Sequence, residues 1–331
     1  MSRELRVALV GATGVLGSEV LAVLSESSLA IGELVPVATD RALGQEIEFR
    51  GETCPVETEL PDLGGVDLLF LCAPAAASLD FARRAIRAEV PCIDASGALA
   101  AAEDLPLAVA ALVPPADASP LVVAPPGSAL AWALALAPLA AHAGLERVVG
   151  VAVEAASWGG RQGIESLYRE SIAIFNQEEL PSPDVFGRPV AFDCIPTLGE
   201  VSSGGATGRE ELLARSVARL LGGEVRVAAT VIQVPAFIGY GASLAIETRR
   251  PLDPKQAEEV LEGAPGIEVW RSEPSAQTLR AAAGRDQVLV GRVRRDPTHA
   301  GGLLLWLTSD LLRLAAANAV QLAVAHLRQH H

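Results

Sequence analysis

Short apolar runs alternate with segments of helical periodicity over the first third of the chain. A run at residues 5–10 precedes a glycine-rich turn at 11–17 and a helical stretch at 18–25. Further strands are predicted at 34–38, 67–72, 90–94 and 121–124, with a helix at 78–88. Continuous apolar runs are typical of strands buried on both faces, and strands that alternate with helices predict a parallel, doubly wound sheet.

From about residue 148 onward the strand candidates become longer and the helices between them fewer. Strands are predicted at 148–156, 224–234, 243–247, 287–294 and 303–307, and helices at 210–221, 254–262 and 310–328. This pattern is typical of an α+β domain with a mixed sheet. We therefore expect an α/β protein of two domains. The first covers residues 1–128, with the C-terminal helix at 310–331 packing back on it, and the second covers 129–309.

The turn at 11–17 has the form G-x-x-G-x-x-G and stands between a strand and a helix. Its glycines let the backbone approach a pyrophosphate, and the helix N-terminus supplies N–H donors and a partial positive charge. The alternative is a tight turn that binds nothing. In this context we favour a Rossmann-type dinucleotide-binding domain. The expected cofactor contacts in the turn are Gly11, Thr13, Gly14, Val15, Leu16 and Gly17.

The residues after the second strand bear on which dinucleotide is preferred. An NAD site would offer an acidic residue there for the ribose hydroxyl. This chain offers Thr39 and Arg41, and Arg41 can pair with a 2′-phosphate, whereas Asp40 between them would repel one. The balance favours NADP(H) over NAD, and a solvated loop arginine is the alternative.

Charge and composition exclude several classes. The net charge is −14 and the pI about 4.9, which argues against a nucleic-acid partner. Four cysteines without C-x-x-C spacing indicate a reducing compartment and no metal site. The apolar stretch at 129–145 is interrupted by Pro138 and His142, which favours a buried helix over a membrane span. Without a signal-peptide pattern, we expect a cytoplasmic protein.

Several segments together resemble one family, the aspartate-semialdehyde dehydrogenases. They are the turn at 11–17 with the Arg41 loop, and the segments 90–97, 159–167, 190–196 and 310–321. The resemblance spans nearly the whole chain and depends on the order and spacing of these segments. It implies a two-domain homodimer that uses NADPH for the reductive dephosphorylation of β-aspartyl phosphate. It further implies that Gln321 contacts the cofactor and that Glu210 is a substrate-type residue.

The chain departs from this family at the positions that carry the chemistry. The nucleophilic cysteine position falls on Gly127, which has no side chain to form a covalent bond. The neighbouring Ser128 is expected to cap the helix that follows it. By the same resemblance, the catalytic glutamine, the substrate arginine and the catalytic histidine fall on Glu154, Gln233 and Tyr240.

Each of these replacements weakens the family's reaction. An anion at Glu154 opposes anionic substrates, an amide does not replace a guanidinium fork, and a phenol with a pKa of about 10 is a poor base at neutral pH. Two further cation positions of the family fall on Ala100 and Leu213. The loss of several cations that would face an anionic substrate predicts a lost or replaced activity.

Three functions remain open. The first is a non-catalytic, NADP(H)-binding member that resembles the Usg-type paralogues and acts through nucleotide, dimer or partner-protein binding. The second is an active oxidoreductase on another carbonyl compound, with Tyr240 and Glu154 as acid and base. The third is a weak aspartate-semialdehyde dehydrogenase. The resemblance also implies a homodimer, for which the apolar strands at 225–234 and 303–307 are candidates. Burial of these strands within one monomer is the alternative, and a heterodimer with an active relative also stays open.

Overall fold

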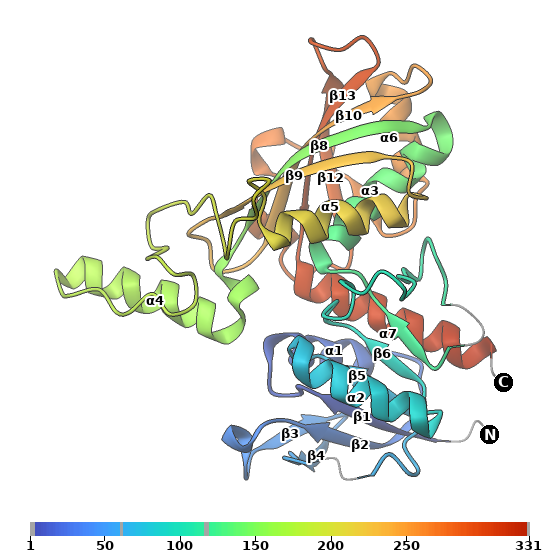
Figure 1. The fold of residues 1–331 in the computed structure, drawn as a ribbon, viewed down its shortest axis with the longest axis vertical. Coiled ribbons are helices and arrows are strands. Elements are labelled where there is room, and N and C mark those ends of the chain that lie inside the picture. The colour runs from blue at the N-terminus through green and yellow to red at the C-terminus, as the bar shows by residue number, and fades with distance from the viewer. Residues whose placement is uncertain (1–3, 60–61, 116–118, 330–331) are drawn as a thin grey trace. The chain divides into compact units, whose positions relative to one another are not determined.

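The computed structural model describes residues 4–59, 62–115 and 119–329, which fold into two compact units (Figure 1). The first unit combines Met1–Gly127 with Ala315–His331, and the second is Ser128–Leu314. The chain therefore leaves its first unit at Gly127, the residue expected at the nucleophile position, and returns to it at Ala315.

The first unit contains a parallel sheet of five strands in the order β2-β1-β5-β6-β7. The strands are β1 (Leu5–Val10), β2 (Ile31–Val37), β5 (Leu68–Leu71), β6 (Cys92–Asp94) and β7 (Leu121–Val123), and the helices between them are α1 (Val15–Glu26) and α2 (Ala75–Ala88). The predicted parallel, doubly wound sheet is thus confirmed. Strand β2 begins earlier than predicted, because the exposed Gly32 and Glu33 hide its start from a search for apolar runs.

A short antiparallel hairpin follows β2 and was not predicted. Its strands are β3 (Glu46–Phe49) and β4 (Glu52–Pro55). Arg50 and Gly51 form the two-residue turn, and both have positive φ, as a type I′ hairpin requires. The hairpin is largely polar, with Phe49 as its buried side chain, so it lacks the apolar alternation that identifies a half-buried strand.

The last helix, α7 (Leu311–Gln329), completes the core of the first unit. Its alanine and valine side chains, including Ala316 and Val320, are buried in one cluster with Phe70 and Ile93 of the sheet. Beside them the side-chain oxygen of Asn318 accepts a hydrogen bond of 3.0 Å from the backbone N–H of Ala110. The small side chains let the helix lie close to the sheet, and the amide satisfies a backbone donor that burial would otherwise leave unpaired.

The second unit contains a mixed sheet of six strands in the order β11-β12-β13-β10-β8-β9. Its strands are β8 (Leu145–Glu154), β9 (Arg226–Gln233), β10 (Tyr240–Thr248), β11 (Ile267–Val269), β12 (Val288–Arg295) and β13 (Gly302–Ser309). The pairs β8–β9 and β11–β12 are parallel, and the remaining pairs are antiparallel. The predicted α+β domain with a mixed sheet is confirmed.

Helices lie against this sheet and beside it. They are α3 (Gly127–Ala143), α4 (Gly160–Asn176), α5 (Gly208–Leu220) and α6 (Pro254–Glu262), with short 3-10 helices at Asp40–Ala42, Ala156–Gly159, Pro274–Ala276 and Leu279–Ala282 elsewhere in the chain. In α3, Trp132 packs so closely on Gly150 of β8 and Leu244 of β10 that a Cβ at Gly150 would lie 2.4 Å from the indole. Helix α3 is thus the buried helix predicted for its apolar stretch. Within the described residues, no helix has the length and apolar character that a membrane crossing requires.

The side chains on one face of the six-stranded sheet are only partly buried. Val151 of β8 is exposed, and it pairs in register with Thr230 of β9 and Ser243 of β10, which in turn pairs with Trp306 of β13. The neighbouring positions on this face, such as Val149, are also only half-buried. The face is therefore a broad surface of largely apolar and small polar side chains.

Candidate functional site

The glycine-rich turn is shaped by close backbone contacts. Gly11 has φ +86°, and a Cβ on it would lie 2.5 Å from the carbonyl oxygen of Cys72, after β5. A Cβ on Gly17 would lie 2.2 Å from the carbonyl oxygen of Gly11. Side chains are excluded at both positions, so the turn requires glycine and brings β1, α1 and the end of β5 close together.

This turn lies where the order of the parallel sheet reverses. From β1 the chain goes to β2 on one side and then to β5 on the other, and ligands of open α/β sheets bind at the carboxyl ends of strands at such a point. Gly14 is exposed and is the N-cap of α1, and it supplies no side chain to pair with the first N–H groups of that helix. The first turn of α1 therefore presents donors suited to a phosphate.

The remaining predicted nucleotide contacts lie on the surface of the same unit. Thr39 and Arg41 are exposed, and Arg41 belongs to the 3-10 helix Asp40–Ala42 after β2. Within the described part of the chain Arg41 forms no ion pair, so its guanidinium is available. Gln321 is an exposed residue of α7. Thr13, Val15 and Leu16 are half-buried in the turn and the start of α1.

Gly127, the residue expected at the nucleophile position, is the first residue of a helix. Helix α3 begins at Gly127 itself, immediately after Pro125 and Pro126. The prediction that Ser128 caps this helix was wrong, because Ser128 already lies within its first turn. Proline lacks an N–H and has a fixed φ that suits a helix start, so Pro125 and Pro126 are compatible with a start ahead of the serine.

Tyr240, the residue expected at the catalytic histidine position, is fully buried. The indole N–H of Trp132 donates a hydrogen bond of 2.7 Å to the hydroxyl of Tyr240, and both side chains are 0% exposed. Burial raises the pKa of the Tyr240 phenol above its ordinary value, outweighing the opposing effects of Trp132 and Arg209. The phenol therefore serves as packed structure, and its geometry counts against the acid–base role in direct hydride transfer.

Glu154, the residue expected at the catalytic glutamine position, has a partner of opposite charge. The Glu154 carboxylate, at the end of β8, forms an ion pair with the guanidinium of Arg209 in α5. Trp158 stacks on that guanidinium, with 3.4 Å between the guanidinium carbon and the ring centroid. Burial lowers the pKa of Arg209 to about 9, which leaves it protonated at neutral pH. Glu154 is thus neutralised from within the chain.

Gln233, the residue expected at the substrate arginine position, also bonds to other parts of the chain. Gln233, at the end of β9, is 0% exposed, and its amide N–H donates a hydrogen bond of 2.8 Å to the backbone oxygen of Glu154. Its own backbone exchanges two hydrogen bonds of 2.9 Å with Ile195. The amide joins the ends of β8 and β9 and is not available as a substrate receptor.

Glu210 is an N-terminal capping residue of α5. One carboxylate oxygen accepts hydrogen bonds from the backbone and hydroxyl of Thr207, and the other accepts one of 3.0 Å from the backbone of Val231 in β9. Together with the bond from Glu210 N–H to Thr207, this forms a capping box. Ala100 and Leu213, the residues expected at two further cation positions of the family, are buried in the core. The carboxylate of Glu210 already has protein partners on both oxygens.

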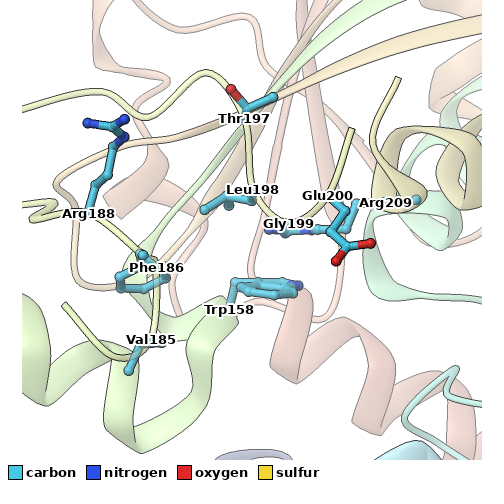
Figure 2. Close-up of a pocket in the computed structure, with 11 residues that line it drawn as sticks. Trp158, Val185, Phe186, Arg188, Thr197, Leu198, Gly199, Glu200 and Arg209 are labelled. Carbon is cyan, nitrogen blue, oxygen red and sulfur yellow. The ribbon is translucent and has the colours of Figure 1, made fainter. Parts of the chain in front are cut away.

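Arg209, the partner of Glu154, lines a pocket of about 770 Å³ (Figure 2). Buried Phe186 and Leu198 and half-exposed Trp158 form much of its apolar lining, and Arg188, Glu200 and Arg209 supply its charges. A cavity of this size accommodates a small organic molecule. Sequence reasoning missed this pocket, because its walls come from the end of β8, the segment at 185–200 and the start of α5.

The wall of the pocket at residues 185–191 is held in place by a buried carboxylate. Glu170 of α4 is 0% exposed and accepts hydrogen bonds of 2.6 and 2.9 Å from the backbone N–H groups of Val190 and Ala191. The hydroxyl of Ser166 donates to its other oxygen. Figure 1 shows α4 extending away from the six-stranded sheet, so these bonds tie the following segment to it. The pocket wall is therefore fixed by polar contacts as well as by packing.

A parallel sheet with a glycine turn at its switch point, joined to a mixed-sheet unit, is the architecture of the two-domain dehydrogenases that use nicotinamide nucleotides. Comparisons with known proteins specify this class. Residues 6–118 match the family model "Semialdehyde dehydrogenase, NAD binding domain", and residues 136–314 match "Semialdehyde dehydrogenase, dimerisation domain".

Relatives and solved structures agree. The chain is 32% identical over 337 residues to aspartate-semialdehyde dehydrogenase 2 of Vibrio cholerae, with 100% of both chains covered. It is also 32% identical over 336 residues to a USG-1 protein homolog of Azotobacter vinelandii, with 99% of each covered. The crystal structure of aspartate semialdehyde dehydrogenase II from Vibrio cholerae matches with a TM-score of 0.94 and 31% identity, covering 99% of this chain and 100% of that one. The chain therefore belongs to the aspartate-semialdehyde dehydrogenase family.

Proposed function

We propose that this chain binds NADP(H) but does not carry out the cysteine-dependent reaction of its family. The single observation on which this depends is Gly127, a residue without a nucleophile, at the start of α3. The polar groups at the other catalytic positions support the same conclusion, because Glu154 and Tyr240 have protein partners in place of a substrate. Without a thiolate, neither the hemithioacetal nor the acyl intermediate forms.

The proposal for the cofactor is supported by the open glycine turn. Gly14 leaves the first N–H groups of α1 without a side-chain cap, and Gly11 and Gly17 exclude side chains from the approach to the backbone. Arg41 supplies an unpaired guanidinium after β2, which favours the 2′-phosphate of NADP over NAD. Calorimetric titration of the purified protein with NADPH tests this part, and absence of binding at millimolar concentration would contradict it.

A direct assay tests the loss of catalysis. Purified protein is incubated with aspartate semialdehyde, phosphate and NADP, and the formation of NADPH is followed. We expect no turnover above the protein-free rate, and phosphate-dependent turnover would overturn the proposal. The variant Gly127→Cys is also expected to stay inactive, because the thiolate would lack a base at Tyr240 and a carboxylate receptor at Gln233. Strong activity of this variant would show that the remaining site is intact.

We further propose a homodimer formed through the open face of the six-stranded sheet, in a cytoplasmic protein. The face around Val151 and Trp306 is broad and only partly buried, as expected of a surface that another copy covers. The four cysteines are free thiols, which suits a reducing compartment. The substitution Val151→Asp is expected to yield a monomer in sedimentation velocity experiments, and an unchanged dimer would assign the interface elsewhere.

A further inference from the structure

Arg209 is a cation that pairs with Glu154 and interacts electrostatically with Tyr240, two of the residues expected at catalytic positions. Its side chain is 19% exposed, and that of its partner Glu154 only 5%. Trp158 stacks on the guanidinium and also lines the adjoining pocket. The cation is thus held between an aromatic ring and a carboxylate at the edge of a cavity.

The chemistry of this arrangement is that of an occupied oxyanion receptor. A planar guanidinium binds carboxylates and phosphates through parallel N–H groups, and such pairs are strongest where water is excluded. Here the oxyanion belongs to the chain itself. Glu210, the adjacent carboxylate, does not compete for Arg209 through hydrogen bonds, because its oxygens accept from Thr207 and Val231.

We propose that Glu154 is an internal ligand of Arg209, and that this contact closes the pocket's buried cation to small carboxylates and phosphates. Arg209 is therefore a latent receptor for oxyanions, and Glu154 is the residue that excludes them. The pocket beside it has an apolar lining at Phe186 and Leu198, with the exposed charges of Arg188 and Glu200 on its walls. The inference uses residues of the second unit alone, so it stands or falls separately from nucleotide binding.

The prediction follows from charge balance. Replacing Glu154 by an uncharged side chain leaves a desolvated guanidinium without a counter-charge, which is strongly unfavourable. An anion from solution that reaches Arg209 relieves this cost. Removing both charges together restores a neutral site, which then has no need of an anion.

The experiment compares Glu154→Gln with a matched control, Glu200→Gln. Glu200 is an exposed carboxylate that lines the same pocket but does not pair with Arg209. Sodium formate and inorganic phosphate are the probes, and sodium chloride at equal ionic strength is the reference. Thermal unfolding and calorimetry are measured for each protein. We expect Glu154→Gln to bind formate at least about tenfold more tightly than the unmodified chain. Glu200→Gln and the double variant Glu154→Gln/Arg209→Gln should behave like the unmodified chain.

Each outcome decides the matter. A saturable rise of the Tm of Glu154→Gln in formate, absent in the double variant, supports the proposal. A response of Glu200→Gln as large as that of Glu154→Gln overturns it, because the effect is then one of general pocket charge. Where Glu154→Gln does not fold in chloride, folding in formate supports the proposal, and failure to fold in formate contradicts it.

Discussion

The glycine turn of the first unit differs from a cluster in the second unit that comprises Glu154, Arg209, Trp132 and Tyr240. The two regions differ in whether their polar groups have partners within the chain. At the turn, the N-cap Gly14 offers no side chain, and the first N–H groups of α1 face an exposed position. In the cluster, Arg209 has Glu154 and Tyr240 has Trp132. One region leaves helix donors without a side-chain cap, where a ligand would bind, whereas the other pairs Arg209 and Tyr240 with side chains of the same chain.

This difference distinguishes the proposed nucleotide site from the site where the family's reaction would occur. Donors without protein partners at a helix start are most useful when an anion completes them, which suits a retained nucleotide site. A site for an anionic substrate needs free cations, and here Arg209 is already paired with Glu154. Under the proposed function, the two units of this scaffold have changed independently, one keeping nucleotide binding and the other losing the chemistry of its family.

The largest expected effect concerns the Trp132–Tyr240 pair in the cluster of the second unit. Trp132→Ala removes a fully buried side chain that packs on Gly150 and Leu244 and leaves the Tyr240 hydroxyl without its donor. We expect the free energy of unfolding to fall by about 3–5 kcal/mol, measured by urea denaturation. Tyr240→Phe is the milder comparison and should cost about 1–3 kcal/mol, because it leaves only the indole N–H unpaired. A decrease of less than about 1 kcal/mol in the free energy of unfolding of Trp132→Ala would show that this pair does not stabilise the second unit.

The next effect concerns the open turn. Gly17→Ala places a Cβ 2.2 Å from the carbonyl oxygen of Gly11, so the turn must shift. We expect NADPH affinity to fall by about a hundredfold, or ~2.7 kcal/mol, in calorimetric titrations. Gly263→Ala is the matched control, because a Cβ there would lie 3.9 Å from the nearest atom beyond its chain neighbours. Unchanged affinity in Gly17→Ala would mean that the turn is a structural feature without a ligand.

A smaller effect sharpens the cofactor assignment. Arg41→Ala removes the exposed guanidinium after β2 and should weaken NADPH binding by about tenfold while leaving NADH binding unchanged. Arg50→Ala, in the turn of the β3–β4 hairpin, is the control for the loss of an arginine from this unit. Equal weakening of both nucleotides would contradict a role for Arg41 in recognising the 2′-phosphate.

The smallest effect is a pH dependence at the capping box. Burial raises the pKa of Glu210, but hydrogen bonds from Thr207 and Val231, together with the charge of Arg209, outweigh it, so the pKa lies below its ordinary value. A lowered folded-state pKa means that the stabilisation is complete above the unfolded-state pKa, about 4.3, and is lost as the pH falls through the folded-state value. Unfolding at a series of acidic pH values should therefore show a steeper loss of stability in the unmodified chain than in Glu210→Gln. Parallel curves would exclude this role.

Much of the first unit was predictable, because continuous apolar strands and a glycine turn are local patterns. The α3 start was misplaced at Ser128, since the effect of the two preceding prolines was not weighed against capping. The β3–β4 hairpin was missed because its strands are mostly polar and exposed.

The residues of the cluster in the second unit could be singled out from sequence, but their partners could not. Glu154, Gln233 and Tyr240 were identified as altered positions, yet Glu154 looked like an unmatched anion that opposes substrates. Its partner Arg209 lies on a distant helix, and no spacing rule joins a strand end to a helix start so far along the chain. Partners that meet through tertiary folding leave no local signal.

The most direct test of the account is a single calorimetric comparison on the unmodified protein. One run titrates NADPH, and the matched run titrates aspartate semialdehyde in the presence of NADP and phosphate. The account predicts a saturable binding heat for NADPH and no heat of turnover in the second run. Sustained heat from turnover, or the absence of any NADPH binding at millimolar concentration, would contradict the claim that this chain keeps the nucleotide site and has lost the chemistry.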